Sequence, residues 1–318
     1  MTAIREVGKI NENTTLIDYG LFGVAGVGAV YLVEAGKTCL IDCGTRTEAP
    51  RIIKTLKELN AFPPDYIVIT HSHWDHCQGI PVLRKQATKN ITVMASEKAI
   101  PLLEDQSWNN IFNPNKNYQN VKDVIPLKEW ENIDLDGLNL RIFDVPGHIK
   151  DHIAILDEKN KNIFVGDALG NKIGDQTFLP PFMPPYWNKD DFYASLDKLK
   201  QIDYDSICLA HFGYIYEDEA KKILEEARNV CDQWWQIFET AENDDKIDDV
   251  DYIVDLIMKE LSPVIPEFKM EKFMMKFLLG LMNIFRKLTF KEPLVVSNIL
   301  LKENVEWLIK GYKIYKNL

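Results

Sequence analysis

Four potential metal ligands fall within six residues of this chain, and they constrain its fold more than any other feature. They are His71, His73, Asp75 and His76 in THSHWDHC, directly after the apolar run DYIVI. That run predicts a buried strand, and side chains that leave a strand's carboxyl end can converge at the edge of a sheet. Residues i and i+2 of a strand point the same way, so His71 and His73 can bind one ion. A turn at Trp74 would let Asp75 and His76 face a second ion.

The other histidines also follow or end short apolar runs. His148 follows LRIFDVPG, His152 comes four residues later, and His211 ends SICLAH. Asp167 ends NIFVGD, and the two oxygens of a carboxylate could bridge two ions. Apart from His152, each residue ends an expected strand, which predicts one pocket at a sheet edge. His152 keeps two interpretations: contact with the substrate or the ligands, or a buried hydrogen-bonded histidine.

Imidazole and carboxylate ligands suit Zn²⁺ and also accept Fe or Mn. We therefore expect two divalent metal ions, zinc before iron or manganese, with Asp167 as the bridging carboxylate. Such ions lower the pKa of bound water to about 7 and polarise a carbonyl or phosphoryl oxygen. The pattern predicts a hydrolase that uses a metal-bound hydroxide on a small-molecule substrate.

Strands and helices are expected to alternate over the first two-thirds of the chain, which indicates an α/β protein whose sheets are covered by helices. A hairpin is expected to turn at 35–37, and DDFYASLDKLKQI to form a helix. Segments 107–120 and 175–191 are expected to be loops, the second either a pocket wall or packing beneath a surface loop.

From about Glu217 the pattern is helical only. We therefore divide the chain into a catalytic domain, 1–216, and a helical carboxyl-terminal domain, 217–318, which would act as a lid, a substrate contact or a dimer contact. The stretch FMMKFLLGLMNIFRKL within it suits a buried helix, a contact between two copies in a homodimer, or a membrane-surface helix.

Composition limits the partners. A net charge of −11 argues against a general nucleic-acid binder, because phosphate neutralisation needs a basic face. No window has the roughly 18 to 20 apolar residues that stable membrane insertion requires, and no signal peptide is recognisable, so a cytoplasmic location is expected. The five cysteines form no CxxC pair and are expected to be reduced and buried.

The motifs LIDCG, THSHWDH, PGH, FVGD and AHFG, spread over about 14–215, resemble those of the metallo-β-lactamase superfamily. The resemblance implies an αββα sandwich with the metals at one edge. It implies that Asp167 bridges the two ions and that Asp42 supports their ligands. It also implies two ligand sets, one for each ion: His71, His73 and His148 for the first, and Asp75, His76 and His211 for the second.

Within the superfamily, THSHWDH and PGHIKDH are most similar to the glyoxalase II group of thioester hydrolases, which also carries a helical carboxyl-terminal domain. This favours an ester, thioester or lactone as substrate, with Asp75 orienting the nucleophile and moving its proton. Tyr214, close to His211 in sequence, is a candidate contact for the ligands or the substrate. The alternatives are an iron-dependent oxidoreductase or dioxygenase on the same fold, a phosphodiesterase, and a metal-bearing binding protein.

Overall fold

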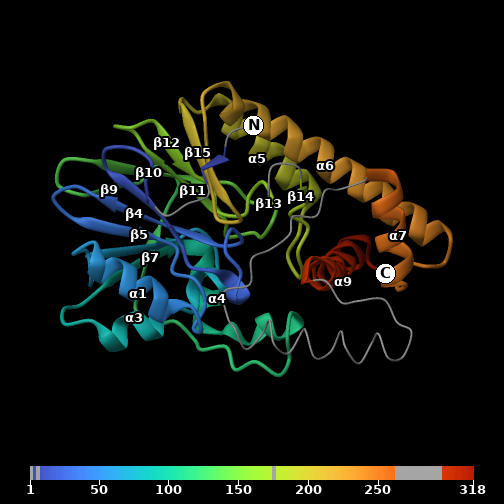
Figure 1. The fold of residues 1–318 in the computed structure, drawn as a ribbon, viewed down its shortest axis with the longest axis horizontal. Helices are drawn as coiled ribbons and strands as arrows, with labels where there is room; N and C mark the ends of the chain where they lie inside the picture. The colour runs from blue at the N-terminus through green and yellow to red at the C-terminus, as the bar shows by residue number, and fades with distance from the viewer. Residues whose placement is uncertain (1–2, 5–7, 174–176, 262–295) are drawn as a thin grey trace.

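Two seven-stranded sheets pack face to face in the structure, a computed structural model that describes residues 3–4, 8–173, 177–261 and 296–318 (Figure 1). Apolar side chains from both sheets form one buried cluster between them, with Leu16 and Val68 from one sheet and Ile142 and Phe164 from the other. Such double-faced burial explains why the central strands read as continuous apolar runs.

The first sheet is antiparallel at one side and parallel at the other. Its order is β2-β3-β4-β5-β6-β7-β8, and β5, β6, β7 and β8 run parallel. The parallel half brings the carboxyl ends of its strands to one edge. The strand bounds are Gly8–Lys9, Thr14–Asp18, Ala29–Glu34, Thr38–Ile41, Tyr66–Ile69, Thr92–Ser96 and Val124–Leu127.

The second sheet has the order β1-β16-β15-β12-β11-β10-β9. Its pairs are antiparallel except for β12 and β15, which run parallel and so end at the same edge. In spatial order the strand bounds are Ala3–Ile4, Gly213–Tyr216, Ser206–Leu209, Asn162–Phe164, Ile153–Asp157, Asn139–Asp144 and Asn132–Asp134.

Helices cover the outer face of each sheet, which completes the αββα sandwich and confirms the expected fold class (Figure 1). Helices α1 (Ala49–Glu58) and α3 (Ile80–Gln86) lie beside the first sheet. Helix α5 (Lys189–Gln201) buries Phe192, Leu196 and Leu199 beside the second. The shorter helices are α2 (Trp74–Cys77), α4 (Ile100–Glu104), and the 3-10 turns η1 (Leu21–Gly23), η2 (Glu97–Ala99) and η3 (Gln106–Ile111).

The expected hairpin and the expected helix α5 are confirmed. Strands β4 and β5 turn where the amide of Ala35 donates to the carbonyl of Lys37 at 3.0 Å. The two expected loops were partly wrong. Segment 107–120 begins inside η3, which Asp105 caps by accepting from the amide of Ser107. Segment 175–191 contains part of a small hairpin, β13 (Asn171–Ile173) with β14 (Thr177–Leu179).

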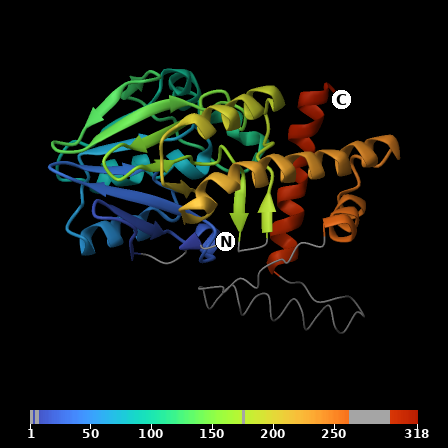
Figure 2. The same cartoon turned by 90° about the horizontal axis from the view of Figure 1, so that it is seen from above.

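Beyond Tyr216 the described residues form three helices, α6 (Asp218–Asn243), α7 (Val250–Leu261) and α9 (Val296–Lys316). Helix α9 crosses the long helix α6 (Figure 2). The ring of Tyr312 lies 4.6 Å from that of Trp235 and 5.6 Å from that of Phe238. These aromatic contacts fix α9 to the rest of the structure.

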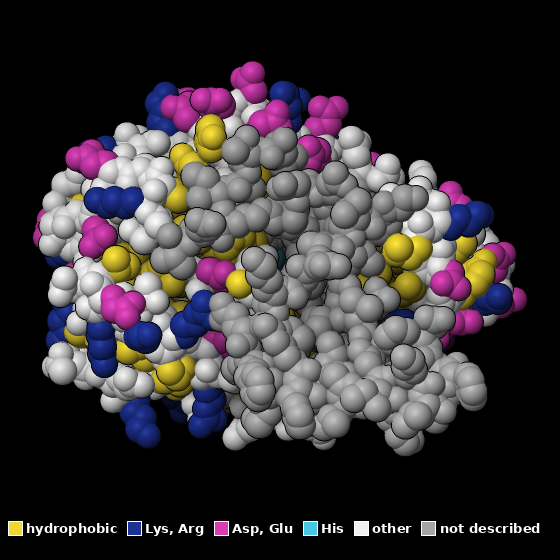
Figure 3. Space-filling view, in the orientation of Figure 1, with side chains coloured by type: hydrophobic (Ala, Val, Ile, Leu, Met, Phe, Trp, Pro, Cys, Tyr) yellow, Lys and Arg dark blue, Asp and Glu magenta, His cyan; other side chains and the backbone are white. Residues whose placement is uncertain are grey.

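The proposed boundary at 216 and the dimer contact stay predictions, and FMMKFLLGLMNIFRKL lies outside the described residues. No described helix is long and apolar enough to cross a membrane. Acidic and basic side chains are interspersed on the described part of the surface in view (Figure 3).

Helix α9 packs tightly against the loop before α5, and a substitution at Gly311 can test this contact. A Cβ on Gly311 would collide with the backbone carbonyl of Phe182. We expect Gly311→Ala to lower the free energy of unfolding by about 1 to 3 kcal/mol, because overpacking outweighs the better helix propensity of alanine. Urea unfolding measures it. Gly8→Ala, which meets no atom within 4 Å, should change the stability little, and an unchanged Gly311→Ala protein would contradict the contact.

Candidate metal centre

Four of the candidate ligands leave the first sheet together. Strand β6 ends at Ile69, His71 and His73 follow it, and the chain then enters the single helical turn α2. Asp75 and His76 lie on that turn. The turn expected at Trp74 therefore exists, and it carries the second pair of side chains back towards the first.

Three more candidates leave the second sheet. His148 follows β10, Asp167 follows β12 and His211 follows β15. Gly147 precedes His148 with φ +138°, and a Cβ there would collide with Phe192 of α5. This close approach accounts for the glycine of the PGH motif. The candidate ligands from both sheets therefore lie at one edge of the sandwich.

The first cluster consists of three imidazoles. Nε2 of His71 lies 2.9 Å from Nδ1 of His73, and Nε2 of His148 lies 2.8 Å from that same atom. All three side chains are buried. Their nitrogens are close enough together to hold one metal ion.

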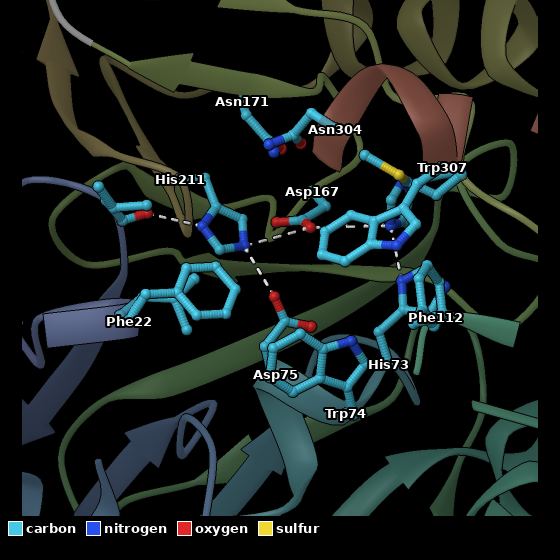
Figure 4. Close-up of a pocket in the computed structure, with 14 residues that line it drawn as sticks. Phe22, His73, Trp74, Asp75, Phe112, Asp167, Asn171, His211, Asn304 and Trp307 are labelled. Carbon is cyan, nitrogen blue, oxygen red and sulfur yellow. Dashed lines mark hydrogen bonds and ion pairs between the residues drawn. The ribbon is translucent and has the colours of Figure 1, made fainter. Parts of the chain in front are cut away.

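The second cluster is formed by Asp75, His76 and His211. Asp167 lies between His211 of this cluster and His73 of the first (Figure 4). Nε2 of His211 is 3.3 Å from Oδ2 of Asp75, and Nε2 of His76 is 3.9 Å from Oδ1. Oδ2 of Asp167 is 3.4 Å from Nε2 of His76, 3.5 Å from that of His211 and 3.7 Å from that of His148. One carboxylate oxygen therefore faces ligands of both clusters.

In four of the imidazoles, the ring nitrogen that points away from the cluster, Nδ1, has a hydrogen-bond partner. Nδ1 of His148 bonds the carbonyl of Pro181 at 2.7 Å, and Nδ1 of His211 bonds that of Val27 at 2.6 Å. Nδ1 of His76 bonds Asp42, and Nδ1 of His71 is 3.2 Å from the hydroxyl of Thr70. Carbonyl and carboxylate acceptors fix the proton on Nδ1, which leaves Nε2 with its lone pair towards the cluster.

The donor set fits divalent cations. Nε2 of His76 and Oδ1 of Asp167 are buried without any hydrogen-bond partner. A buried polar atom without a partner is costly, so such atoms indicate a missing ligand. Nitrogen and oxygen donors gathered in this way are those that Zn²⁺, Fe and Mn bind.

The charges favour a cation as well. Burial alone would lower the pKa of His76 and of His211. The carboxylates, Asp167 foremost, instead raise the pKa of His76 well above its usual range and that of His211 to about 9. Burial would likewise raise the pKa of Asp75, yet the neighbouring imidazoles lower it to about 2. Metal ions bound here would replace protons on the two imidazoles.

Asp42 contacts two segments that carry candidate ligands, the residues directly after β6 and the turn α2. Its carboxylate accepts from the amide and the hydroxyl of Thr70, both at 2.8 Å, and lies 2.8 Å from Nδ1 of His76. Asp42 itself has φ +59°, a conformation that few residues other than glycine and Asn or Asp adopt. The residue therefore lies behind the ligands, where the resemblance placed it.

His152 lies behind the cluster and is buried. Its Nε2 accepts from the amide of Asp167 at 3.0 Å, and its ring stacks on that of His71 at 4.6 Å. These contacts favour support of the ligands over contact with substrate. Cys77 is a buried free thiol, as expected.

The expectation for Tyr214 is not supported. The residue lies on β16 and packs against the core between the sheets, with its ring stacked on that of Tyr216 at 5.6 Å. Tyr214 does not line the pocket beside the ligands. The sharp turn after His211 starts a new strand, and the strand carries Tyr214 away from the pocket.

Sequence reasoning missed most of the pocket wall. Trp74 is both buried and part of the wall. The wall is otherwise formed by apolar side chains and two amides from distant segments, namely Leu21, Phe22, Val27, Phe112, Asn171, Met183, Asn304 and Trp307. Nothing in the sequence marks these residues as neighbours of the ligand motifs.

Comparisons with known proteins indicate the family of the chain. The model of the metallo-beta-lactamase superfamily matches residues 23–211. The beta-lactamase-like protein 2 homolog of Caenorhabditis elegans is 24% identical over 231 residues, which cover 71% of this chain and 70% of that protein. A hydroxyacylglutathione hydrolase of Ruegeria pomeroyi is 26% identical over 57% of this chain and 60% of its own length, so the chain spans less than two thirds of that relative.

The fold also matches a solved structure along nearly its whole length. An archaeal metallo-beta-lactamase superfamily protein from Sulfolobus tokodaii aligns with a TM-score of 0.58 at 18% identity. The alignment covers 95% of this chain and 99% of that one. The similarity therefore includes helices beyond the two sheets.

Asp42 offers a test of the centre that does not depend on activity. We expect Asp42→Asn to weaken metal affinity by about 10- to 100-fold, because the neutral amide holds His76 and Thr70 less firmly. Competition with a chelator measures the affinity. Asp136→Asn removes an exposed carboxylate that pairs with Lys37, and it should leave the affinity unchanged. Equal affinities for both variants would exclude the supporting role.

Proposed function

Because the chain belongs to the metallo-beta-lactamase superfamily and is a metal-dependent hydrolase, we propose that it binds two divalent ions and cleaves a small ester, thioester or lactone. The resemblance to the superfamily and to its glyoxalase II-like group is confirmed by the family match and the relatives. The observation that carries the dinuclear proposal is the position of Asp167. Its Oδ2 lies within 3.7 Å of imidazoles from both clusters.

Zinc is the proposed metal, with iron or manganese as alternatives that the same ligands accept. The first ion would be held by His71, His73 and His148, and the second by the cluster of Asp75. When bound, such ions supply a nucleophile from water at neutral pH and polarise the carbonyl that is attacked.

Asp75, Asp42 and His152 have the other roles in the proposed reaction. Asp75 lines the pocket and is the more exposed of the two cluster carboxylates, at 15% against 7% for Asp167. It can therefore reach the substrate side and accept the proton of the attacking water. Asp42 and His152 keep the ligands in place from behind, and the apolar wall excludes bulk water.

Metal content and bond type can be measured together. We expect the purified protein to contain about two equivalents of divalent metal per chain by elemental analysis. It should cleave at least one of an ester, thioester and lactone panel. A phosphodiester tests the phosphodiesterase alternative, and oxygen consumption with iron tests the oxidoreductase one. Two equivalents of metal without any turnover would favour a binding protein.

The bridging role predicts a specific loss. Asp167→Asn keeps the shape of the side chain but removes its charge between the clusters, so we expect one equivalent of metal to be lost. Turnover should fall by at least about 100-fold, the size of effect that a displaced reacting geometry produces. Asp144→Asn, at the end of β10 and paired with Lys98, is the matched control. Full metal content and turnover in Asp167→Asn would refute the assignment.

A further inference from the structure

We propose that the pocket selects an uncharged substrate with an apolar acyl group, and that helix α9 supplies the side chain that makes this selection. The inference rests on the proposed hydrolase function and specifies its substrate class. It is carried by the walls on either side of the ligands and by the placement of the charged side chains around them.

One wall stands beside the first cluster. The ring of Phe112 meets that of His73 edge to face at 5.2 Å, and the ring of Trp307 meets Phe112 at 5.5 Å. Met183 also lines the pocket. The imidazole of His73, a candidate ligand, therefore packs against an aromatic surface that extends onto α9 (Figure 4).

A second wall stands beside the other cluster. The ring of Phe22 lies 6.0 Å from that of Trp74, the residue between His73 and Asp75. Leu21 and Val27 continue this surface. A reacting bond above the ligands would therefore have apolar surface on both sides.

The core fixes the position of helix α9, which carries Asn304 and Trp307 of the pocket wall. Asn304 and Trp307 are three residues apart and so share one face of the helix, which lines the pocket. Val305, Leu308 and Tyr312 are buried in the core. Because the core fixes α9, the indole of Trp307 is a fixed part of the wall.

The described residues place no lysine or arginine in the pocket wall. Lys172, next to Asn171, is buried and directed to Glu226 at 3.3 Å. Lys116 lies over the ring of Trp74 at 4.1 Å and lines a neighbouring hollow. An ionised substrate group against the wall of Phe112 and Trp307 would lose its hydration without a compensating positive charge from any described side chain of the pocket.

The polar groups of the wall suit uncharged partners. Asn171 and Asn304 lie close together on the side of the pocket above Asp167 (Figure 4). The amide of Asn171 can donate and accept hydrogen bonds, so it suits a neutral carbonyl, amide or hydroxyl. Acyl methylenes would gain free energy by leaving water for the aromatic walls.

The test compares thioesters of one uncharged thiol, N-acetylcysteamine, whose acetyl, hexanoyl and succinyl forms differ only in the acyl group. We expect kcat/KM for hexanoyl to exceed that for acetyl by about tenfold or more, and that for succinyl to be the lowest. An S-hydroxyacylglutathione, whose leaving group is charged, should also react more slowly than the hexanoyl thioester.

Trp307→Ala should reduce the hexanoyl-to-acetyl ratio by about tenfold, and Trp307→Phe should retain most of the ratio because it keeps a ring. Trp130→Ala, at a tryptophan that is 61% exposed and outside the pocket, should leave the ratio unchanged. Binding of hexanamide against acetamide to the purified, metal-loaded protein gives the same comparison without turnover.

The outcomes separate this inference from the proposed function. If no ester, thioester or lactone is cleaved, the hydrolase proposal fails. If thioesters are cleaved but the succinyl or glutathione forms are preferred, the hydrolase proposal stands and the substrate class is wrong. If hexanoyl is preferred and Trp307→Ala keeps the full ratio, the role of α9 is refuted.

Discussion

Nitrogen lone pairs that face one another inside the protein are the constraint on which the rest of the structure depends. His71, His73 and His148 bring ring nitrogens within 2.9 Å in a buried setting. Carbonyl and carboxylate acceptors behind the rings of His76, His148 and His211 hold the protons of these imidazoles on the outer side. Such an arrangement is stable only when a cation shares the lone pairs. The edges of both sheets, the turn α2 and the glycine before His148 all serve to maintain it.

The fold separates the task of holding metal from the task of recognising substrate. The ligands come from the carboxyl ends of strands whose cores are fixed between helices and a second sheet. The pocket wall comes from segments outside the two large sheets, including η1, the residue that follows η3, the β13–β14 hairpin and α9. Side chains on these segments can change without disturbing the strand ends, which agrees with a fold that carries several chemistries.

Much of the centre could be predicted because its signals are local. Two histidines at i and i+2 after an apolar run, followed by an acid and a third histidine, specify their own geometry at a strand end. The position of Asp167 beside both clusters agrees with its place after another apolar run. The αββα class followed from the resemblance and the alternation of elements.

The wall could not be predicted, since it depends on contacts between distant segments. Trp307 follows the same helical periodicity whether its face meets the core or a pocket. Tyr214 was misplaced because closeness to His211 in sequence was taken for closeness in space, while the intervening turn reverses the chain. The 3-10 turn η3 depends on an Asp105 cap that carries no periodic signal.

The position of α9 at the far end of the chain has an evolutionary consequence. Every candidate ligand precedes Phe212 in the sequence, whereas two residues of the pocket wall, Asn304 and Trp307, follow residue 295. Replacement of the segment that carries α9 would therefore change the wall that contacts the substrate and leave every candidate ligand in place. Related proteins with the same histidines would then differ in substrate preference, and the difference would lie in the segment of α9.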